Sequence, residues 1–398
     1  MSVWPWLAAA IALTFLLVTV IYYRRLCRLV RAVTLFSPRR IVDNFRNMHR
    51  IYPTTVTRRA PQAFQFERGH ISLPPHFDFR GQQLKTRQFI EDTRTTGFLV
   101  LHADRIVREE YRLGQTAATT CISWSVAKSI VSGLFGIAMA EGFIHSIEDR
   151  VTDYVPELKN SGYDGVRIKD VLQMSSGVAF NEDYKDFHSD ISRLGRVLAV
   201  GGSLDRFAAS LKREHPPGSR HHYVSVDTHV LAMILTRTTG RSITDYLEEK
   251  IWQKIGTEAD AYWITDDLGV ELALGGFNAT LRDYARIGRL FLRWGNWNGE
   301  QIIPAQWIRD SITPDAAHLM PGENNLSDNV MGYGYQWWIP EHPQGDYVAI
   351  GIYNQFIYIH PDKQLVIAKT SANHHYSQDT VTSEHQSVAL FQAIANSL

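Results

Sequence analysis

The chain has 398 residues, enough for one large domain or two modest ones with a substantial core. Lysine plus arginine and aspartate plus glutamate both number 41, so the net charge argues against a nucleic-acid-binding protein and against a trap for acidic ligands. The two cysteines, Cys27 and Cys121, are too few for a disulfide framework.

The histidines do not suggest a metal site. The sixteen of them form no HExxH motif and no Cys/His ligand spacing. Two adjacent pairs, at 221–222 and 374–375, would point their side chains to opposite faces of a strand. We therefore expect no metal, no other cofactor and no nucleic-acid partner.

The N-terminal segment from Val3 to Tyr23 is uncharged, and as a helix it would span about 30 Å, the thickness of a bilayer core. Trp4, Trp6 and Tyr22 lie near its ends, where interfacial aromatic residues belong. No basic residue precedes it and no small-residue cleavage site follows it. This pattern predicts a transmembrane anchor over residues 1–23, with a cleaved signal peptide as the alternative.

A basic segment follows the predicted anchor. Arginines at 24, 25, 28 and 31 place the rest of the chain on the cytoplasmic side, by the positive-inside tendency. We interpret residues 24–76 as a basic juxtamembrane linker. Its first half either lies along an anionic membrane surface or forms a solvated helix broken at Pro38. Four prolines between residues 51 and 76 predict an extended arm.

Residues 77–398 are predicted to form the globular domain. Near its start we expect a helix over 84–92 and strands over 97–102 and 106–111. A buried helix follows Ser125, and residues 178–222 read as a polar, irregular loop. Further helices are expected over 228–238, 243–252, 281–294 and 382–396, with strands over 333–339, 347–351, 356–360 and 365–370. Strands at both ends with helices between them indicate an α+β fold, one antiparallel sheet plus a helical lobe.

The strongest candidate for chemistry is the sequence Ser125-Val-Ala-Lys128, which opens the apolar helix. Three residues of helix turn through roughly 300°, so the two side chains lie on one face within reach of each other. Burial disfavours the charged form of an amine, and a neutral Lys128 can take the proton of the serine hydroxyl. A chance Ser-x-x-Lys on a helix is the competing interpretation. The backbone N–H groups of the first turn are free to stabilise an oxyanion.

Several motifs recur in a characteristic order. Ser125-x-x-Lys128 is followed by Tyr223-x-Ser225 and then by Gly351-Ile352-Tyr353 on a late strand. In this order the chain resembles the serine β-lactamase and penicillin-binding superfamily, and within it the 6-aminohexanoate-dimer hydrolases and related carboxylesterases. The narrower resemblance rests on the stretches at 223–228, 260–263, 276–283, 333–338 and 349–355. It covers roughly residues 80 to 395 and implies a β-lactamase-like fold.

The resemblance also implies roles for individual residues. Ser125 would be the nucleophile, Lys128 its base, and Tyr223 a relay that passes the proton to the leaving group after a cation lowers its pKa. The backbone N–H groups of Ser125 and Ile352 would form the oxyanion hole. The substrate-binding positions would be Tyr184, Ser225 and Asn278; a loop aromatic and a helix-flanking amide are the plain alternatives for Tyr184 and Asn278.

Two departures from the superfamily pattern bear on the substrate. Ser225 stands where an asparagine is usual, and the third motif lacks the lysine that would hold a β-lactam carboxylate. We do not assign Lys369-Thr370-Ser371 to that motif, because by its order it falls on the following edge of the sheet. The sequence thus favours a membrane-anchored serine hydrolase that cleaves small amides or esters through an acyl-enzyme. The alternatives are a peptidoglycan-directed peptidase or β-lactamase, and a non-catalytic scaffold of the same fold.

Overall fold

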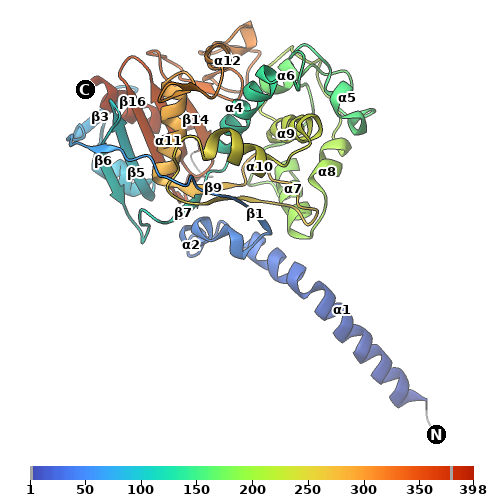
Figure 1. The fold of residues 1–398 in the computed structure, drawn as a ribbon. Helices are drawn as coiled ribbons and strands as arrows, with labels where there is room; N and C mark the ends of the chain where they lie inside the picture. Colours follow the sequence, from blue (N-terminus) through green and yellow to red (C-terminus); the bar gives the residue numbers. More distant parts are fainter. Residues whose placement is uncertain (1–2, 377–379) are drawn as a thin grey trace.

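The computed structural model describes residues 3–376 and 380–398 (Figure 1). Its main sheet has eight strands in the order β12 (Gly332–Tyr333), β13 (Trp338–Ile339), β14 (Tyr347–Gly351), β15 (Gln355–His360), β16 (Leu365–Ser371), β5 (Thr95–His102), β6 (Arg105–Tyr111) and β2 (Glu67–Arg68). All neighbours pair antiparallel except β2 with β6. The predicted antiparallel sheet, formed by strands from both ends of the chain, is confirmed.

A second, four-stranded sheet lies below the helical lobe in Figure 1. Its order is β1 (Thr54–Thr57), β8 (Ala261–Ile264), β9 (Phe277–Thr280) and β7 (Thr120–Ile122). This sheet was not predicted from the sequence, since each of its strands is only three or four residues long. Two small hairpins complete the strands: β3 (His76–Phe79) with β4 (Gln82–Lys85), and β10 (Asn296–Trp297) with β11 (Glu300–Gln301).

The helices cover both faces of the main sheet and form the lobe beside it. They are α1 (Trp4–Val33), α2 (Ile41–Arg46), α3 (Thr86–Asp92), α4 (Val126–Ala140), α5 (Val151–Tyr154), α6 (Ile168–Leu172), α7 (Asp190–Ala199), α8 (Leu204–Ser210), α9 (Ser225–Thr239), α10 (Ile243–Leu247), α11 (Leu281–Leu292), α12 (Ala305–Ser311) and α13 (Thr380–Asn396). The prediction of an irregular loop over 178–222 is wrong in part, because this region contains α7 and α8. Ser189 and Ser203 cap these two helices, and both caps are a local signal that the sequence analysis did not use.

The core has two layers, one on each side of the main sheet. Successive side chains of a strand point to opposite faces, so Leu99 and Leu101 of β5 belong to the layer shared with α4, α9 and α11. Phe98 and Val100 belong to the other layer, which includes Phe391 of α13. Because α4 lies inside the first layer, nearly all of its residues are buried.

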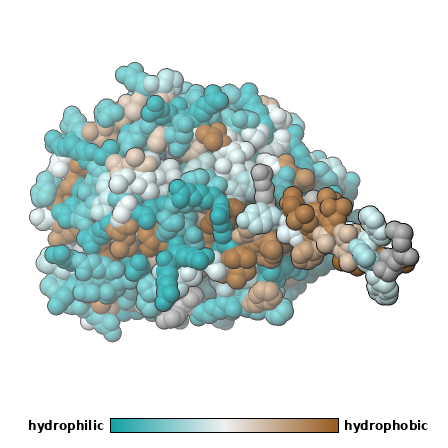
Figure 2. Space-filling view, turned by 90° about the horizontal axis from the view of Figure 1, so that it is seen from below, coloured by the Kyte–Doolittle hydropathy of each residue, from teal (hydrophilic) through white to brown (hydrophobic). Residues whose placement is uncertain are grey.

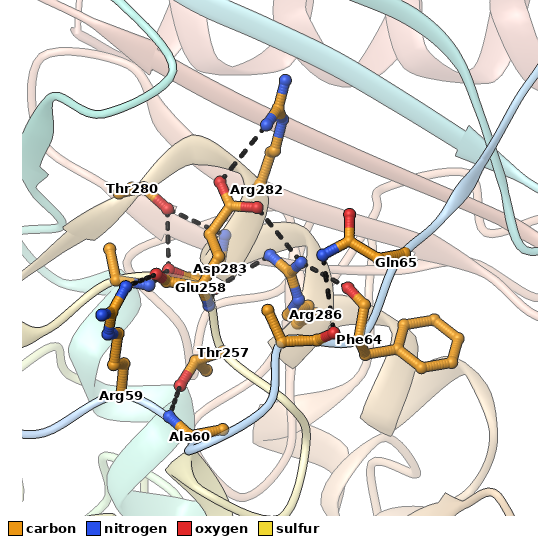
Figure 3. Close-up of polar contacts among 12 residues, drawn as sticks. Arg59, Ala60, Phe64, Gln65, Thr257, Glu258, Thr280, Arg282, Asp283 and Arg286 are labelled. Atoms are coloured by element: carbon orange, nitrogen blue, oxygen red, sulfur yellow. Dashed lines mark hydrogen bonds and ion pairs between the residues drawn. The ribbon is translucent and has the colours of Figure 1, made fainter.

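The structure differs most from the prediction in the segment that was predicted as a linker, residues 24–76. Its apolar residues Ile41, Phe45 and Met48 are buried in the main core, and β1 pairs with β8 along its whole length. Polar contacts hold the residues after β1 (Figure 3). Ala60 N–H donates to Thr257 at 3.2 Å, and the Arg286 guanidinium donates to the carbonyl of Phe64 at 2.7 Å. From about residue 35 onward the chain is therefore part of the folded domain, not a solvated arm.

Helix α1 projects away from the body of the molecule (Figure 1). It bends by 57° between the parts Trp4–Val20 and Arg25–Val33. The second part packs against α7, and Arg28 pairs with Asp267 at 2.5 Å. Over the residues that the structure describes, no single helix is both long and apolar enough to cross a bilayer; only the two bent parts of α1 together meet that test. The single transmembrane helix predicted over residues 3–23 is not confirmed.

Candidate active site

The predicted contact between Ser125 and Lys128 is present. Ser125 is the N-cap residue of α4, and Lys128 lies one turn further along the same helix. The Lys128 Nζ is 2.9 Å from Ser125 Oγ and donates a hydrogen bond to the carbonyl of Leu274 at 2.6 Å. A well-directed amine beside a serine hydroxyl is the arrangement that activates a nucleophile.

The protonation of Lys128 follows from its burial. Its side chain is 1% exposed, and burial lowers the pKa of the amine to about 7, although Glu182 and Asp227 act in the opposite direction. Desolvation thus outweighs two nearby carboxyl groups. Near neutral pH a large fraction of Lys128 is an uncharged amine, able to accept the proton of Ser125.

Tyr223 completes the cluster from the other side. It immediately precedes the N-cap of α9, and its ring stacks on Trp338 with centroids 5.5 Å apart. Its hydroxyl shares a hydrogen bond with Ser125, and Lys128 Nζ lies 5.2 Å from the ring centroid. The structure therefore brings together the three residues expected to act as nucleophile, base and relay.

The expected pKa shift of Tyr223 is wrong. Burial, followed by the nearby Glu182, raises the pKa of this phenol far above its usual value, and the hydrogen bond with Ser125 lowers it only in part. The expected cation does not reverse this, because burial favours the neutral form of Lys128 too. Tyr223 consequently keeps its proton and can serve as a donor.

The two backbone N–H groups of the predicted oxyanion hole lie where β14 ends against α4. A Cβ added to Gly351 would be 2.4 Å from the carbonyl oxygen of Ser123 and 3.1 Å from the nitrogen of Ser125, so only glycine allows this approach. Within residues 3–376 and 380–398, neither the Ser125 nor the Ile352 N–H has a hydrogen-bond acceptor. Free donors at this place suit a developing negative charge.

Glu182 is a site residue that the sequence analysis missed. Both Tyr184 and Ser225 donate hydroxyl hydrogen bonds to its carboxyl group, each at 2.7 Å, and Ser225 N–H adds a third at 3.3 Å. The Glu182 carboxyl group thus binds two of the predicted substrate-binding residues, Tyr184 and Ser225. Glu182 lies in a loop more than 40 residues before Ser225, and a lone acidic residue in a polar segment carries no recognisable signal.

Two other residues lie outside the cluster. Asn278 is fully buried on β9, where its amide donates to the carbonyl of Gly276 at 2.8 Å, and it does not line the cavity described next. Lys369 of β16 is also buried, and its Nζ donates to Ser371 Oγ at 2.8 Å. Lys369 thus lies on β16, whereas the third motif lies at the end of β14.

A cavity of about 280 Å³ opens beside Ser125. Ser125, Tyr184 and Ile352 contribute to its lining, and α1, α7 and the segment after α1 form most of its walls. Trp124, which precedes Ser125, also lines it. The candidate nucleophile and one oxyanion donor thus face a space large enough for a small ligand.

Comparison with known proteins identifies the family. The Beta-lactamase family model matches residues 85–390. The 6-aminohexanoate-dimer hydrolase of Paenarthrobacter ureafaciens is 33% identical over 293 residues, which cover 72% of this chain and 74% of that protein. The residues that the family model matches include Ser125, Lys128, Tyr223 and Ile352.

Solved structures agree with this result. A "putative 6-aminohexanoate-dimer hydrolase" from Bacillus anthracis superposes with a TM-score of 0.81 at 26% identity, covering 91% of this chain and 95% of that one. EstCE1, a hydrolase with promiscuous acyltransferase activity, shares the fold, with a TM-score of 0.62 at 15% identity over 78% of this chain and 96% of that one. The chain belongs to the Beta-lactamase family of hydrolases.

Proposed function

We propose that this protein is a membrane-anchored serine hydrolase that cleaves amides or esters through an acyl-enzyme on Ser125. The observation that carries the proposal is the 2.9 Å contact between Ser125 Oγ and a buried Lys128 whose pKa is lowered to about 7. The similarity to a 6-aminohexanoate-dimer hydrolase supports amide or ester substrates.

The geometry supports the following sequence of steps. Neutral Lys128 takes the proton of Ser125 as Oγ bonds to the carbonyl carbon, and the oxyanion accepts hydrogen bonds from the Ser125 and Ile352 N–H groups. The bond to the leaving group then breaks. Tyr223 donates its proton to the leaving oxygen or nitrogen and recovers a proton from Lys128. A water molecule, activated by the same groups, releases the acid and restores Ser125.

The second candidate, a β-lactamase or peptidoglycan peptidase, lacks a charged group to hold a substrate carboxylate at the third motif. Gly351, Ile352 and Tyr353 stand there, and the nearby Lys369 is bonded to Ser371. We therefore expect p-nitrophenyl acetate to be a better substrate than nitrocefin. A catalytic efficiency for nitrocefin well above that for the ester would favour the second candidate.

The direct test is covalent labelling followed by kinetics. A fluorophosphonate should add to the wild-type chain, and peptide mass spectrometry should place the adduct on Ser125. Ser125→Ala should abolish both labelling and ester hydrolysis, whereas Ser129→Ala, on the next turn of α4, should keep the adduct at Ser125. Retention of most of the activity in Ser125→Ala would show that another residue is the nucleophile.

A further inference from the structure

The cavity beside Ser125 is lined mostly by apolar side chains, which the proposed chemistry does not by itself require. Leu29, Ala32 and Val33 of α1 line one wall, and Leu194 and Leu198 of α7 line another. The described lining side chains that carry a polar group are Tyr52, Trp124, Ser125, Tyr184, Ser192 and Arg196. The Arg196 guanidinium lies 4.0 Å from the Phe187 ring centroid and bonds to the Phe187 carbonyl, so its charge is already engaged.

The position of the proton donor fixes which half of a substrate this cavity would hold. A leaving group must lie toward Tyr223, which donates the proton, and Tyr223 does not line the cavity. Ser125 and Ile352, the nucleophile and an oxyanion donor, do line it. The part of the substrate that remains attached to Ser125 therefore extends into the apolar space.

The surface next to the cavity also suits an apolar ligand. The wall formed by α1 continues into the exposed apolar part of that helix, where Ile11, Phe15 and Leu16 are all more than half exposed. Figure 2 shows apolar side chains gathered along α1 and at its base. The helix that lines the cavity thus also carries an exposed apolar surface suited to lipid.

We infer that the cavity binds the acyl chain of a fatty-acyl ester or amide. This inference rests on the proposed function and narrows its substrate class. In the overall reaction the substrate and one water molecule give a fatty acid and the released alcohol or amine, with the acyl chain held between α1 and α7 while it is bonded to Ser125 Oγ.

The test uses isomeric esters that differ only in where the long chain lies. Ethyl octanoate carries its chain on the acyl side, and octyl acetate carries it on the alcohol side. We expect ethyl octanoate to have the higher kcat/KM, by tenfold or more. Along the series of ethyl acetate, butanoate, hexanoate and octanoate, each methylene buried should raise kcat/KM by up to about fourfold. A preference for octyl acetate, or a flat acyl series, would overturn the inference.

Gly195 allows the cavity to be filled without damage to the fold. It lines the cavity from α7, and a Cβ added there would meet no other atom within 4 Å. Gly195→Leu should lower the ratio of kcat/KM for ethyl octanoate to kcat/KM for ethyl acetate at least tenfold, because the added side chain competes with the long acyl chain for the cavity. The matched control Gly195→Ala gains the same helix propensity but adds one methyl group, so it should keep most octanoate activity.

The two proposals fail in different ways. If neither an ester nor an amide is cleaved, or if Ser125→Ala cleaves them as well as the wild type does, the proposed function is wrong. If Ser125-dependent cleavage of ethyl acetate is found, but Gly195→Leu affects both esters equally, only the assignment of the acyl chain is wrong. Equal effects would mean that α7 supports the site without contacting the chain.

Discussion

Burial in the same site gives Lys128 the properties of a base and Tyr223 those of an acid. Burial disfavours charge in both, so it lowers the pKa of the amine and raises that of the phenol. Near pH 7 the phenol therefore keeps its proton, which it can give, and a large fraction of the amine is uncharged and has a lone pair to accept one. Acid–base sites typically contain two titratable groups whose pKa values are shifted apart, so that one can act as the base and the other as the acid.

A pH profile tests this assignment. Lys128 is active as a base when it has lost its proton, and its pKa is lowered to about 7. The kcat/KM for a neutral ester should consequently rise about tenfold per pH unit below pH 7 and reach a plateau above it. A profile that is flat from pH 5 to 8 would contradict Lys128 as the base.

A second group titrates in the same pH range as Lys128, so its contribution to the pH profile must be distinguished from that of Lys128. Burial raises the pKa of Glu384 to about 7, and this carboxyl group also acts on Tyr223. Glu384→Gln removes its titration and leaves Lys128 in place. We expect the rising limb to persist in this variant; its loss would assign the limb to Glu384.

At the scale of elements, the N-terminal segment supports the oxyanion hole. Trp124 and Tyr353 directly adjoin Ser125 and Ile352, and both have left-handed backbone, with φ of 45° and 62°. Such conformations cost about 1–3 kcal/mol each and need support from their surroundings. Phe45 packs edge-on against both rings, at centroid distances of 5.5 and 5.4 Å. The same ring thus holds the two backbones that carry the oxyanion donors.

Removing this ring should affect both stability and catalysis. Phe45 is 1% exposed, so we expect Phe45→Ala to lower the free energy of unfolding by about 3–5 kcal/mol. The folded fraction should also show a reduced kcat with little change in KM, because the donors act on the transition state. Chemical denaturation and kinetics at a temperature where the variant is folded would measure both. Phe143→Ala, at a position 40% exposed, is the matched control and should change neither.

The same segment shows what the sequence could and could not reveal. Contacts set by helical spacing were predictable, as with Ser125 and Lys128, and so were the long apolar strands of the main sheet. The prolines and arginines after residue 37 suggested a linker, although Ile41, Phe45 and Met48 follow the i, i+4, i+7 spacing of a buried face. Short strands and loop residues such as Glu182 depend on partners far away in the chain, which no local pattern encodes.

At the scale of the whole molecule, α1 joins a folded hydrolase to an apolar projection. Its second part is docked by α7 and by the pair of Arg28 with Asp267, whereas the side chains described before Val20 are exposed. Exposed apolar surface of this length is costly in water and favourable in lipid. The membrane anchoring that we propose gives this surface an apolar environment.

Two arginines in the projecting part should abolish anchoring. Leu13 and Leu16 are 64% and 59% exposed, so their replacement leaves the folded domain intact. We expect the full chain to stay in the membrane pellet after alkaline carbonate extraction and Leu13→Arg/Leu16→Arg to move to the supernatant, since each central arginine costs about 2.5–3.5 kcal/mol on insertion. Thr14→Ser serves as the control and should stay in the pellet. Release of the wild-type chain by carbonate, or retention of the double variant, would contradict a spanning anchor.

The arginines after Tyr23 further predict that a C-terminal fluorescent protein that matures only in the cytoplasm is bright and that a C-terminal alkaline phosphatase is inactive. The reverse pair of results would place the hydrolase domain on the other side of the membrane.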